Sequence, residues 1–402
     1  MYESELKKVF GLEGFRLGQA ELVEAAVRAR DILAIMPTGS GKSLCFQLPA
    51  LLQKGATLVV TPLIALMEDQ DRRATENGMK ATYLSHSLGK SEIFVRCANA
   101  VKEPPDLFYV APERLDSDGF GEVLKRMPIA RVVVDEAHCL DQYIEFRPAY
   151  SKVGGIVDQL GVPVSAFTAT ATERTRELIR TSLRMDSPFV HIASMDRPNL
   201  RYEVHKKWPQ DVDQIHSLIT YSVPNGGSGI VYRTTRKEVE STWRSLVGMG
   251  VDCLPYHAGM KAETRSLHQT LFIRGKCPII ISTIAFGMGI DKPDVRWVIH
   301  GDMPTSLEGY FQESGRAGRD GLPATCYMLF DVGDIPKVRS FADNLEGEGN
   351  RKLAYDRIRA VMEYGAAGKG CRRWTLLKYF GECENCAEVR CGNCDLCGKV
   401  ER

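Results

Sequence analysis

The feature that most constrains the fold is a glycine-rich octapeptide, MPTGSGKS (residues 36–43), which lies between an apolar segment and an amphipathic one. The preceding DILAI predicts a buried strand, and the leucines that follow at helical spacing, Leu44, Leu48, Leu51 and Leu52, predict a helix. A strand, a glycine loop and a helix in this order form a P-loop, whose backbone N–H groups hold phosphate oxygens. Met36 stands where the general pattern has glycine, but it falls at the strand end, so residues 38–41 can still make the turn.

The octapeptide also supplies the side chains that a nucleotide site needs. Lys42 is expected to reach the β- and γ-phosphates, and the Ser43 hydroxyl is expected to ligate Mg²⁺. The predicted nucleotide contacts in this loop are Met36, Pro37, Thr38, Gly39, Ser40, Gly41, Lys42 and Ser43.

A second motif, RVVVDEAHCL (131–140), places two carboxylates at the end of a predicted strand. Asp135 can hold Mg²⁺, and Glu136 can orient and deprotonate the water that attacks the γ-phosphate. Adjacent carboxylates alone are commonly a solvated strand end. With a P-loop earlier in the chain, they indicate a nucleoside triphosphatase.

Strand-like segments alternate with helical ones in two groups. The first group is DILAIMP, TLVVTP, DLFYVAP, RVVVDEA and VPVSAFTAT, and the second is GIVYR, VDCLPYH, PIIIST, VRWVIH and ATCYMLF. This alternation is typical of parallel sheets with crossover helices, and 402 residues suffice for two or three domains. From about residue 336 helical periodicity replaces the strands. We therefore expect an α/β protein with domains at residues 1–195, 196–335 and 336–402.

Charge and hydropathy exclude some classes of protein. The 52 Lys and Arg residues nearly cancel the 51 Asp and Glu residues, so local clusters must hold any polyanionic partner. The first residues, MYESELKKVF, lack the apolar core of a signal peptide, and no apolar run reaches the roughly 18 residues of a membrane span. We expect a soluble, cytoplasmic protein.

The cysteines crowd at one end of the sequence. Six of the 12 are Cys371, Cys383, Cys386, Cys391, Cys394 and Cys397. In a reducing compartment, such crowding favours metal ligation over disulfides. By spacing alone, Cys383-x2-Cys386 pairs with Cys394-x2-Cys397, which is a usual Zn²⁺ arrangement.

Six motifs follow one another along the chain in an order that is typical of one protein family. They are MPTGSGKS, TPLIALMEDQ (61–70), DEAHC (135–139), FTATAT (167–172), IAFGMGIDKP (284–293) and QESGRAGRDG (312–321). With the cysteine cluster, they resemble the RecQ family of superfamily 2 DNA helicases over nearly the whole chain, including the Met-Pro-Thr start of the P-loop. The resemblance implies two RecA-like parallel-sheet lobes followed by a small helical zinc-binding domain.

The resemblance also implies an activity. It implies an ATP-dependent DNA helicase or translocase, of 3′ to 5′ direction, that unwinds DNA in replication, recombination or repair. The implied cofactors are ATP, Mg²⁺ and Zn²⁺, and the implied partners are single-stranded and forked DNA. Two other functions remain open: a DNA-clamping or strand-annealing module with residual ATPase, and an RNA helicase. Because the sequence ends just after the cysteines, we expect no winged-helix module and weaker engagement of duplex DNA.

Two further elements of the nucleotide site follow from the resemblance. In FGLEGFRLGQ (10–19) it implies that Gln19 hydrogen-bonds the adenine and that Arg16 stacks on it. The chain departs from the family at Leu12, where an aromatic residue or histidine is usual. In QESGRAGRDG the resemblance implies that Arg316 and Arg319, flanked by Gln312, act as arginine fingers on the transferring phosphoryl group.

The spacing of these two arginines, three residues apart, predicts that they share one face of a helix and reach across from the second lobe.

For the metal, the resemblance implies Cys371, Cys391, Cys394 and Cys397 as ligands. We prefer this set to the one that contains Cys383 and Cys386, because few residues separate the two C-x-x-C pairs and the order of helix and cluster matches the family. Either set predicts a closed, structural Zn²⁺ site.

Nucleic-acid contacts are the least specific of the predictions. Thr61, Arg114, Arg236 and His257 follow strand ends, where open α/β sheets collect ligands, and we expect them to contact DNA phosphates. After DEAHC the family has an aromatic-rich loop that senses DNA, whereas this chain reads LDQYIEFRPAY, without the Trp or His. We expect Tyr143, Phe146 and Arg147 to couple DNA binding to hydrolysis. The alternative is that the two aromatic residues only pack the loop.

Overall fold

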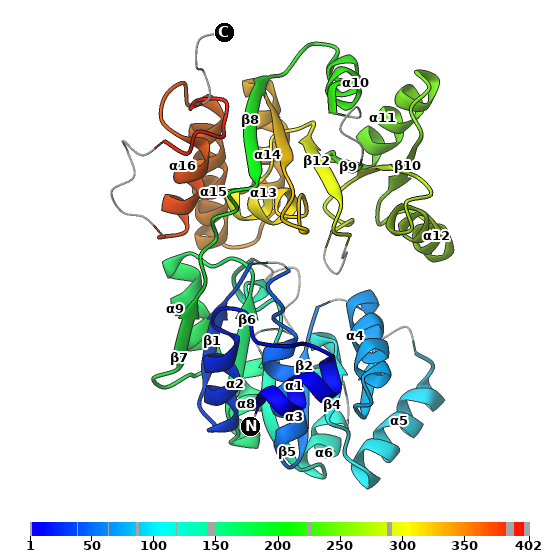
Figure 1. Ribbon diagram of the computed structural model, residues 1–402, viewed down its shortest axis with the longest axis vertical. Coiled ribbons are helices and arrows are strands. Elements are labelled where there is room, and N and C mark those ends of the chain that lie inside the picture. The colour runs from blue at the N-terminus through cyan, green and yellow to red at the C-terminus, as the bar shows by residue number, and fades with distance from the viewer. Residues whose placement is uncertain are drawn as a thin grey trace. The chain divides into compact units, whose positions relative to one another are not determined.

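A computed structural model describes residues 2–37, 39–62, 64–85, 88–117, 119–142, 150, 152–222, 227–287, 292–382 and 390–397. The chain divides into two compact units, Met1–Ser194 and Met195–Arg402. Each unit has its own parallel sheet covered by helices (Figure 1). No helix within the described ranges has the length and hydropathy of a membrane span.

The first unit contains a sheet of seven parallel strands among its described residues, in the order β3-β4-β2-β5-β6-β1-β7. The strands are β1 (Ile32–Ile35), β2 (Ala56–Val60), β3 (Ala81–Leu84), β4 (Leu107–Val110), β5 (Ile129–Val134), β6 (Val164–Thr168) and β7 (Phe189–Ile192). The helices are α1 (Tyr2–Phe10), α2 (Gln19–Val27), α3 (Leu44–Leu52), α4 (Ile64–Glu76), α5 (Lys90–Lys102), α6 (Phe120–Lys125), α7 (Cys139–Gln142), α8 (Val153–Leu160) and α9 (Glu173–Ser182), with a 3₁₀ turn η1 at Pro112–Asp116.

The central strands position the three motifs of this unit. β1 is buried at every residue because helices cover both faces of the sheet, which explains its unbroken apolar sequence. The order β5-β6-β1 places the segments after these strands at one edge of the sheet. Met36 N donates to Thr168 O at 2.9 Å, and Ala137 N donates to Phe167 O at 2.9 Å. The P-loop, the DEAH residues and the FTATAT segment therefore meet at one edge.

The second unit contains a six-stranded parallel sheet in its described part, in the order β10-β11-β9-β12-β13-β8. The strands are β8 (Leu200–Lys206), β9 (Ser228–Tyr232), β10 (Cys253–Tyr256), β11 (Ile279–Ser282), β12 (Val295–His300) and β13 (Ala324–Phe330). The helices are α10 (Asp211–Ser222), α11 (Arg236–Gly248), α12 (Ala262–Ile273), α13 (Leu307–Ser314), α14 (Ile335–Asp343), α15 (Glu348–Ala366) and α16 (Arg372–Tyr379). Trp297 in the middle of the sheet is the largest side chain of the core.

The α/β fold class and all ten predicted strands are confirmed, and helices follow residue 335 as expected. The structure adds β3, β7 and β8. All three are edge strands, and most of their residues are half-buried or exposed, so their sequences lack a continuous apolar run. The compact units divide after residue 194. The predicted boundary at residue 336 stays a prediction.

Candidate functional site

The P-loop leaves β1 at Ile35 and enters α3 at Leu44. Gly39 and Gly41 have φ angles of 83° and 85°, which glycine adopts without strain. A Cβ on Gly41 would also lie 2.5 Å from Gln19 Nε2. Both positions therefore require glycine. Met36 is buried beneath the loop with 1% of its surface exposed, and Thr38 lies outside the described residues.

Lys42 carries a buried ammonium group that has no hydrogen-bond partner in the described part of the chain. An orphaned buried donor is rare and costly, because the group has given up water without a replacement. The Ser43 hydroxyl, at the start of α3, makes no capping hydrogen bond to the helix. The Lys42 ammonium at a helix start fits the phosphate oxygens of a nucleotide.

Arg16 and Gln19, the predicted adenine contacts, hold the backbone of the P-loop. Arg16 Nη1 donates to Gly39 O at 2.6 Å, and Gln19 Nε2 donates to Ser40 O at 2.9 Å. Gln19 Oε1 accepts from Arg16 N at 2.8 Å. These bonds place both side chains beside the loop, and their contact with adenine stays a prediction.

Asp135 follows β5 and is 5% exposed. Burial, and to a smaller extent the neighbouring charge of Glu136, raises the pKa of its carboxyl from 3.8 to about 6. The charge of Lys42 and hydrogen bonds from Glu136 N and the Gln70 side chain oppose this rise. A buried carboxylate whose pKa is raised is stabilised by a cation, so Asp135 fits a Mg²⁺ ligand.

Glu136 has a φ of 51°, a conformation that is strained for any residue with a side chain and that is found at functional sites. Its Oε2 lies 3.4 Å from His138 Nδ1. His138 Nδ1 also lies 2.9 Å from Thr168 Oγ1, which donates to Thr170 O at 3.0 Å. These buried groups connect the catalytic candidate to the FTATAT segment. Both motifs are evident in the sequence, but the supporting roles of the His138 and Thr168 side chains are not.

The arginines of the second unit lie in a turn. α13 ends at Ser314, and residues 315–320 form turns, so the prediction that Arg316 and Arg319 share a helix face is wrong. The physical reason is the glycines that follow, since Gly318 has a φ of 56° that ends regular helix. Arg316 is 8% exposed and its Nη1 donates to Gly287 O. Gln312 lies within α13, and Arg319 is half-buried.

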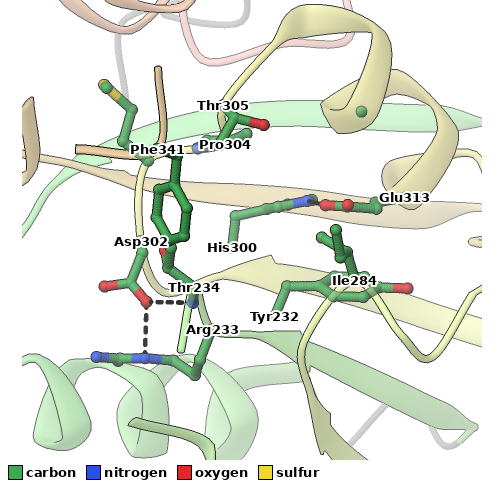
Figure 2. A pocket seen from close by; sticks show the side chains of 12 residues that line it. Tyr232, Arg233, Thr234, Ile284, His300, Asp302, Pro304, Thr305, Glu313 and Phe341 are labelled. Carbon is green, nitrogen blue, oxygen red and sulfur yellow. Dashed lines mark hydrogen bonds and ion pairs between the residues drawn. The ribbon is translucent and has the colours of Figure 1, made fainter. Parts of the chain in front are cut away.

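A pocket of about 140 Å³ lies beside this turn, at the carboxyl ends of β9 and β12 (Figure 2). Asp302 at its wall forms an ion pair with Arg233, whose Nε lies 3.0 Å away, and accepts a hydrogen bond from Thr234 N at 3.0 Å. Burial alone would raise the pKa of Asp302, but the charges of Arg233 and Lys207 bring it below its ordinary value. Across the pocket, His300 Nε2 lies 2.7 Å from Glu313 Oε2 of α13. The His300–Glu313 pair joins α13 to the end of β12.

The predicted DNA contacts differ in exposure. Thr61 is fully buried, and His257 is 7% exposed with its Nε2 3.0 Å from Glu240 Oε1. Arg114 is half-buried in η1, and Arg236 at the start of α11 is exposed. In this conformation Arg236 is accessible to a phosphate, whereas Thr61 and His257 are not. The coupling residues Tyr143, Phe146 and Arg147 lie outside the described residues.

Four cysteines converge at the C-terminal end of the second unit. The Sγ atoms of Cys371, Cys391, Cys394 and Cys397 all lie within 4.8 Å of one another. Tetrahedral Zn²⁺ with bonds of about 2.3 Å needs sulfur separations of about 3.8 Å, so the four thiols fit this ion. Asn393 N donates to the Sγ of Cys391, and Cys397 N donates to the Sγ of Cys394, each at 3.3 Å. Cys383 and Cys386 lie outside the described residues.

Three family models match successive parts of the chain. A DEAD/DEAH box helicase model matches residues 16–179, a helicase conserved C-terminal domain model matches residues 210–321, and a RecQ zinc-binding model matches residues 332–398. The last match covers the cysteine cluster, so the C-terminal region is a zinc-binding domain.

Curated relatives are similar over nearly the whole chain. The ATP-dependent DNA helicase RecQ of Pasteurella multocida is 39% identical, over 98% of this chain and 61% of the relative. That of Bacillus subtilis is 38% identical, over 98% and 66%. The RecQ-like DNA helicase BLM of Xenopus laevis is 37% identical, over 96% and 30%. The chain thus spans less than two thirds of the length of these relatives.

Solved structures share the fold at low sequence identity. S. cerevisiae Dbp5 bound to RNA and ADP BeF3 is 16% identical with a TM-score of 0.67, covering 88% of this chain and 97% of that one. The DUF1998 helicase MrfA bound to DNA and AMPPNP is 18% identical with a TM-score of 0.68, covering 89% and 52%. At this identity the likeness supports the two-lobe helicase fold alone.

Proposed function

This chain belongs to the RecQ family of superfamily 2 helicases, and we propose that it is a DNA-stimulated ATPase that separates DNA strands in the 3′ to 5′ direction. The observation that carries the proposal is the set of three groups at the sheet edge of the first unit where the P-loop lies. There an orphaned Lys42 ammonium after β1, and a buried Asp135 carboxyl and a strained Glu136 backbone after β5, lie beyond the ends of the two strands that flank β6. A metal-assisted phosphoryl transfer site needs these three groups.

The chemistry follows from the individual groups. The Lys42 ammonium pairs with the β- and γ-phosphate oxygens of ATP, which satisfies its missing hydrogen bonds. Ser43 and Asp135 hold Mg²⁺, which neutralises charge on the phosphates when it is bound. A Glu136 carboxylate oxygen accepts the proton of the attacking water. His138 and Thr168 hold that carboxylate in position through the contacts described above.

The remaining roles are proposed from the family. Arg316 and Arg319 stabilise charge on the transferring phosphoryl group. The four converging cysteines hold one Zn²⁺ in a closed site, which supports the fold rather than the reaction. Single-stranded and forked DNA are the proposed substrates, in replication, recombination or repair.

The decisive experiment measures ATP turnover with no nucleic acid, with single-stranded DNA and with single-stranded RNA of the same sequence. We expect single-stranded DNA to stimulate ATP turnover strongly and RNA to stimulate it little. Lys42→Ala is the inactive control. Forked and single-tailed duplexes then test strand separation, and a 3′ tail should support unwinding where a 5′ tail does not. Turnover that DNA leaves unchanged would favour a clamping or annealing module, and stimulation by RNA alone would favour an RNA helicase.

A further inference from the structure

The first residues of the second unit form a short connecting segment, residues 195–200, which we call the strap. The side chains of Arg197 and Asn199 point from the strap to the backbone of the arginine-bearing turn. Arg197 Nη1 donates to Gly315 O at 3.3 Å, and its Nη2 donates to Ala317 O at 3.0 Å and Gly318 O at 2.7 Å. Asn199 Nδ2 donates to Gly318 O at 2.8 Å and to Leu322 O at 2.9 Å.

These bonds matter because the turn has no regular structure of its own. α13 ends at Ser314, so the carbonyl groups beyond it have no helical partners and need other donors. Gly318 has a φ of 56°, and a Cβ at this position would lie 2.4 Å from Asn199 Nδ2. The strap side chains therefore determine the shape of the turn that carries Arg316 and Arg319.

The zinc-binding domain holds the backbone of the same strap. Arg373 Nη2 donates to Pro198 O at 3.2 Å and to Leu200 O at 2.7 Å. Asn393 Nδ2 donates to the same two carbonyl oxygens, at 3.3 Å each. Arg373 is the second residue of α16 and follows Cys371 by two residues, and Asn393 lies between Cys391 and Cys394. The strap is thus bonded through its backbone to the cysteine cluster and through its side chains to the arginine turn.

We propose that Arg197 and Asn199 are positioning residues for Arg316 and Arg319, and that the strap links the zinc-binding domain to the rate of ATP hydrolysis. This inference rests on the proposed ATPase function. An arginine that stabilises a transferring phosphoryl group must be held within about 0.5 Å of its working position. The planar guanidinium of Arg197 donates to three carbonyl groups of the turn at once, and a lysine ammonium has no such fork.

The test compares Arg197→Gln and Arg197→Lys with the matched control Arg201→Gln. Arg201 also lies near the start of the second unit, but within the described residues its side chain pairs with Glu203 at 2.5 Å and not with the turn. With saturating single-stranded DNA, kcat should fall about 10- to 100-fold in both Arg197 variants. The KM for ATP and the affinity for a labelled non-hydrolysable analogue should stay within about twofold, and the control should match wild type. Equal losses in the control would overturn the proposal.

A double variant separates positioning from simple folding. If Arg197 acts through the arginine turn, then Arg197→Gln added to Arg319→Ala should lower kcat little further. Losses that multiply, together with a lowered Tm, would overturn the proposal. Asn199→Ala is the second test should Arg197→Gln not fold, and it should lower kcat with unchanged KM.

The link to the zinc-binding domain is tested by Arg373→Gln. This variant should lower kcat several-fold while native mass spectrometry finds its metal content unchanged. A wild-type kcat in Arg373→Gln would refute the link. If the wild-type chain hydrolyses no ATP, the proposed function fails, whereas an active wild type with an equally active Arg197→Gln refutes the strap alone.

Discussion

Replacing Asp135 with asparagine should stabilise the nucleotide-free protein at neutral pH, although the residue belongs to the proposed active site. The carboxyl is 5% exposed, and burial raises its pKa from 3.8 to about 6. Between these two pH values the unfolded chain binds fewer protons at this site than the folded chain. The contribution of this group to the free energy of unfolding therefore falls as pH rises from about 4 to about 6. Above that range the contribution stays at its lowest value, because the carboxyl is ionised in both states.

The magnitude follows from the two pKa values. Ionisation of Asp135 costs about 3 kcal/mol more in the folded than in the unfolded state, because each pKa unit corresponds to about 1.4 kcal/mol. Asparagine keeps the size of the side chain and stays neutral. We therefore expect Asp135→Asn to raise the free energy of unfolding by up to about 3 kcal/mol at pH 7, and by less than about 1 kcal/mol at pH 4.

The assay is thermal unfolding of the full chain without nucleotide or Mg²⁺ at several pH values, with hydrogen exchange of β5 peptides to localise the effect. Glu68→Gln, which removes an exposed carboxylate on α4, is the control and should differ little from wild type. Adding Mg²⁺ and ATP should stabilise wild type more than Asp135→Asn. A variant less stable than wild type at pH 7, or a stability difference that does not shrink towards pH 4, would refute the reasoning.

Four further outcomes are expected. Lys42→Ala and Glu136→Gln should each abolish ATP hydrolysis while DNA affinity, measured by fluorescence anisotropy, is retained, and near-normal turnover in either would contradict the assignment. Arg319→Ala should lower kcat by about 10³-fold or more in steady-state assays, and a loss of nucleotide affinity alone would give this residue a ground-state role. Native mass spectrometry should find one Zn²⁺ in wild type and none in Cys394→Ala, whose C-terminal region should also unfold; a metal-loaded variant would exclude this ligand. Phe146→Ala should lose DNA-stimulated ATPase with basal hydrolysis and Tm unchanged, whereas undiminished stimulation would place coupling elsewhere.

The sequence predicted the central strands well because each is buried on both faces and therefore reads as an apolar run. The four residues of β1 are all buried, and β12 continues to His300 with nearly complete burial. The edge strand β7 has side chains that are alternately half-buried and exposed, so its composition carries a weaker signal. The edge strand β8 was missed because most of its residues are only partly buried, although its Tyr202 forms a β-bridge with Cys394 of the zinc-binding domain.

The motif residues could be placed from the sequence because parallel strands deliver their carboxyl ends to one edge. The partners of these residues could not. The hydrogen bond from Gln70 to Asp135 joins α4 to the end of β5, and the contact between His138 and Thr168 joins the ends of β5 and β6. Such pairs depend on strand order and register, which a single sequence does not specify. The raised pKa of Asp135 is likewise a consequence of burial, which only the folded chain creates.

The two arginines illustrate the limit of local spacing. A separation of three residues predicts a shared helix face only where the helix continues, and here it ends at Ser314 before either arginine. The direction of the arginines is then set by hydrogen-bond donors from a distant part of the sequence. Arg197 and Asn199 donate to carbonyl groups of the turn, for which the helix no longer provides N–H partners. A helix would have held these arginines without outside help. Because the strap holds the turn instead, the position of the arginines depends on every residue that is hydrogen-bonded to the strap. One of these residues is Arg373, which lies beside the cysteine cluster. A structural metal site can therefore influence a reaction to which it contributes no ligand.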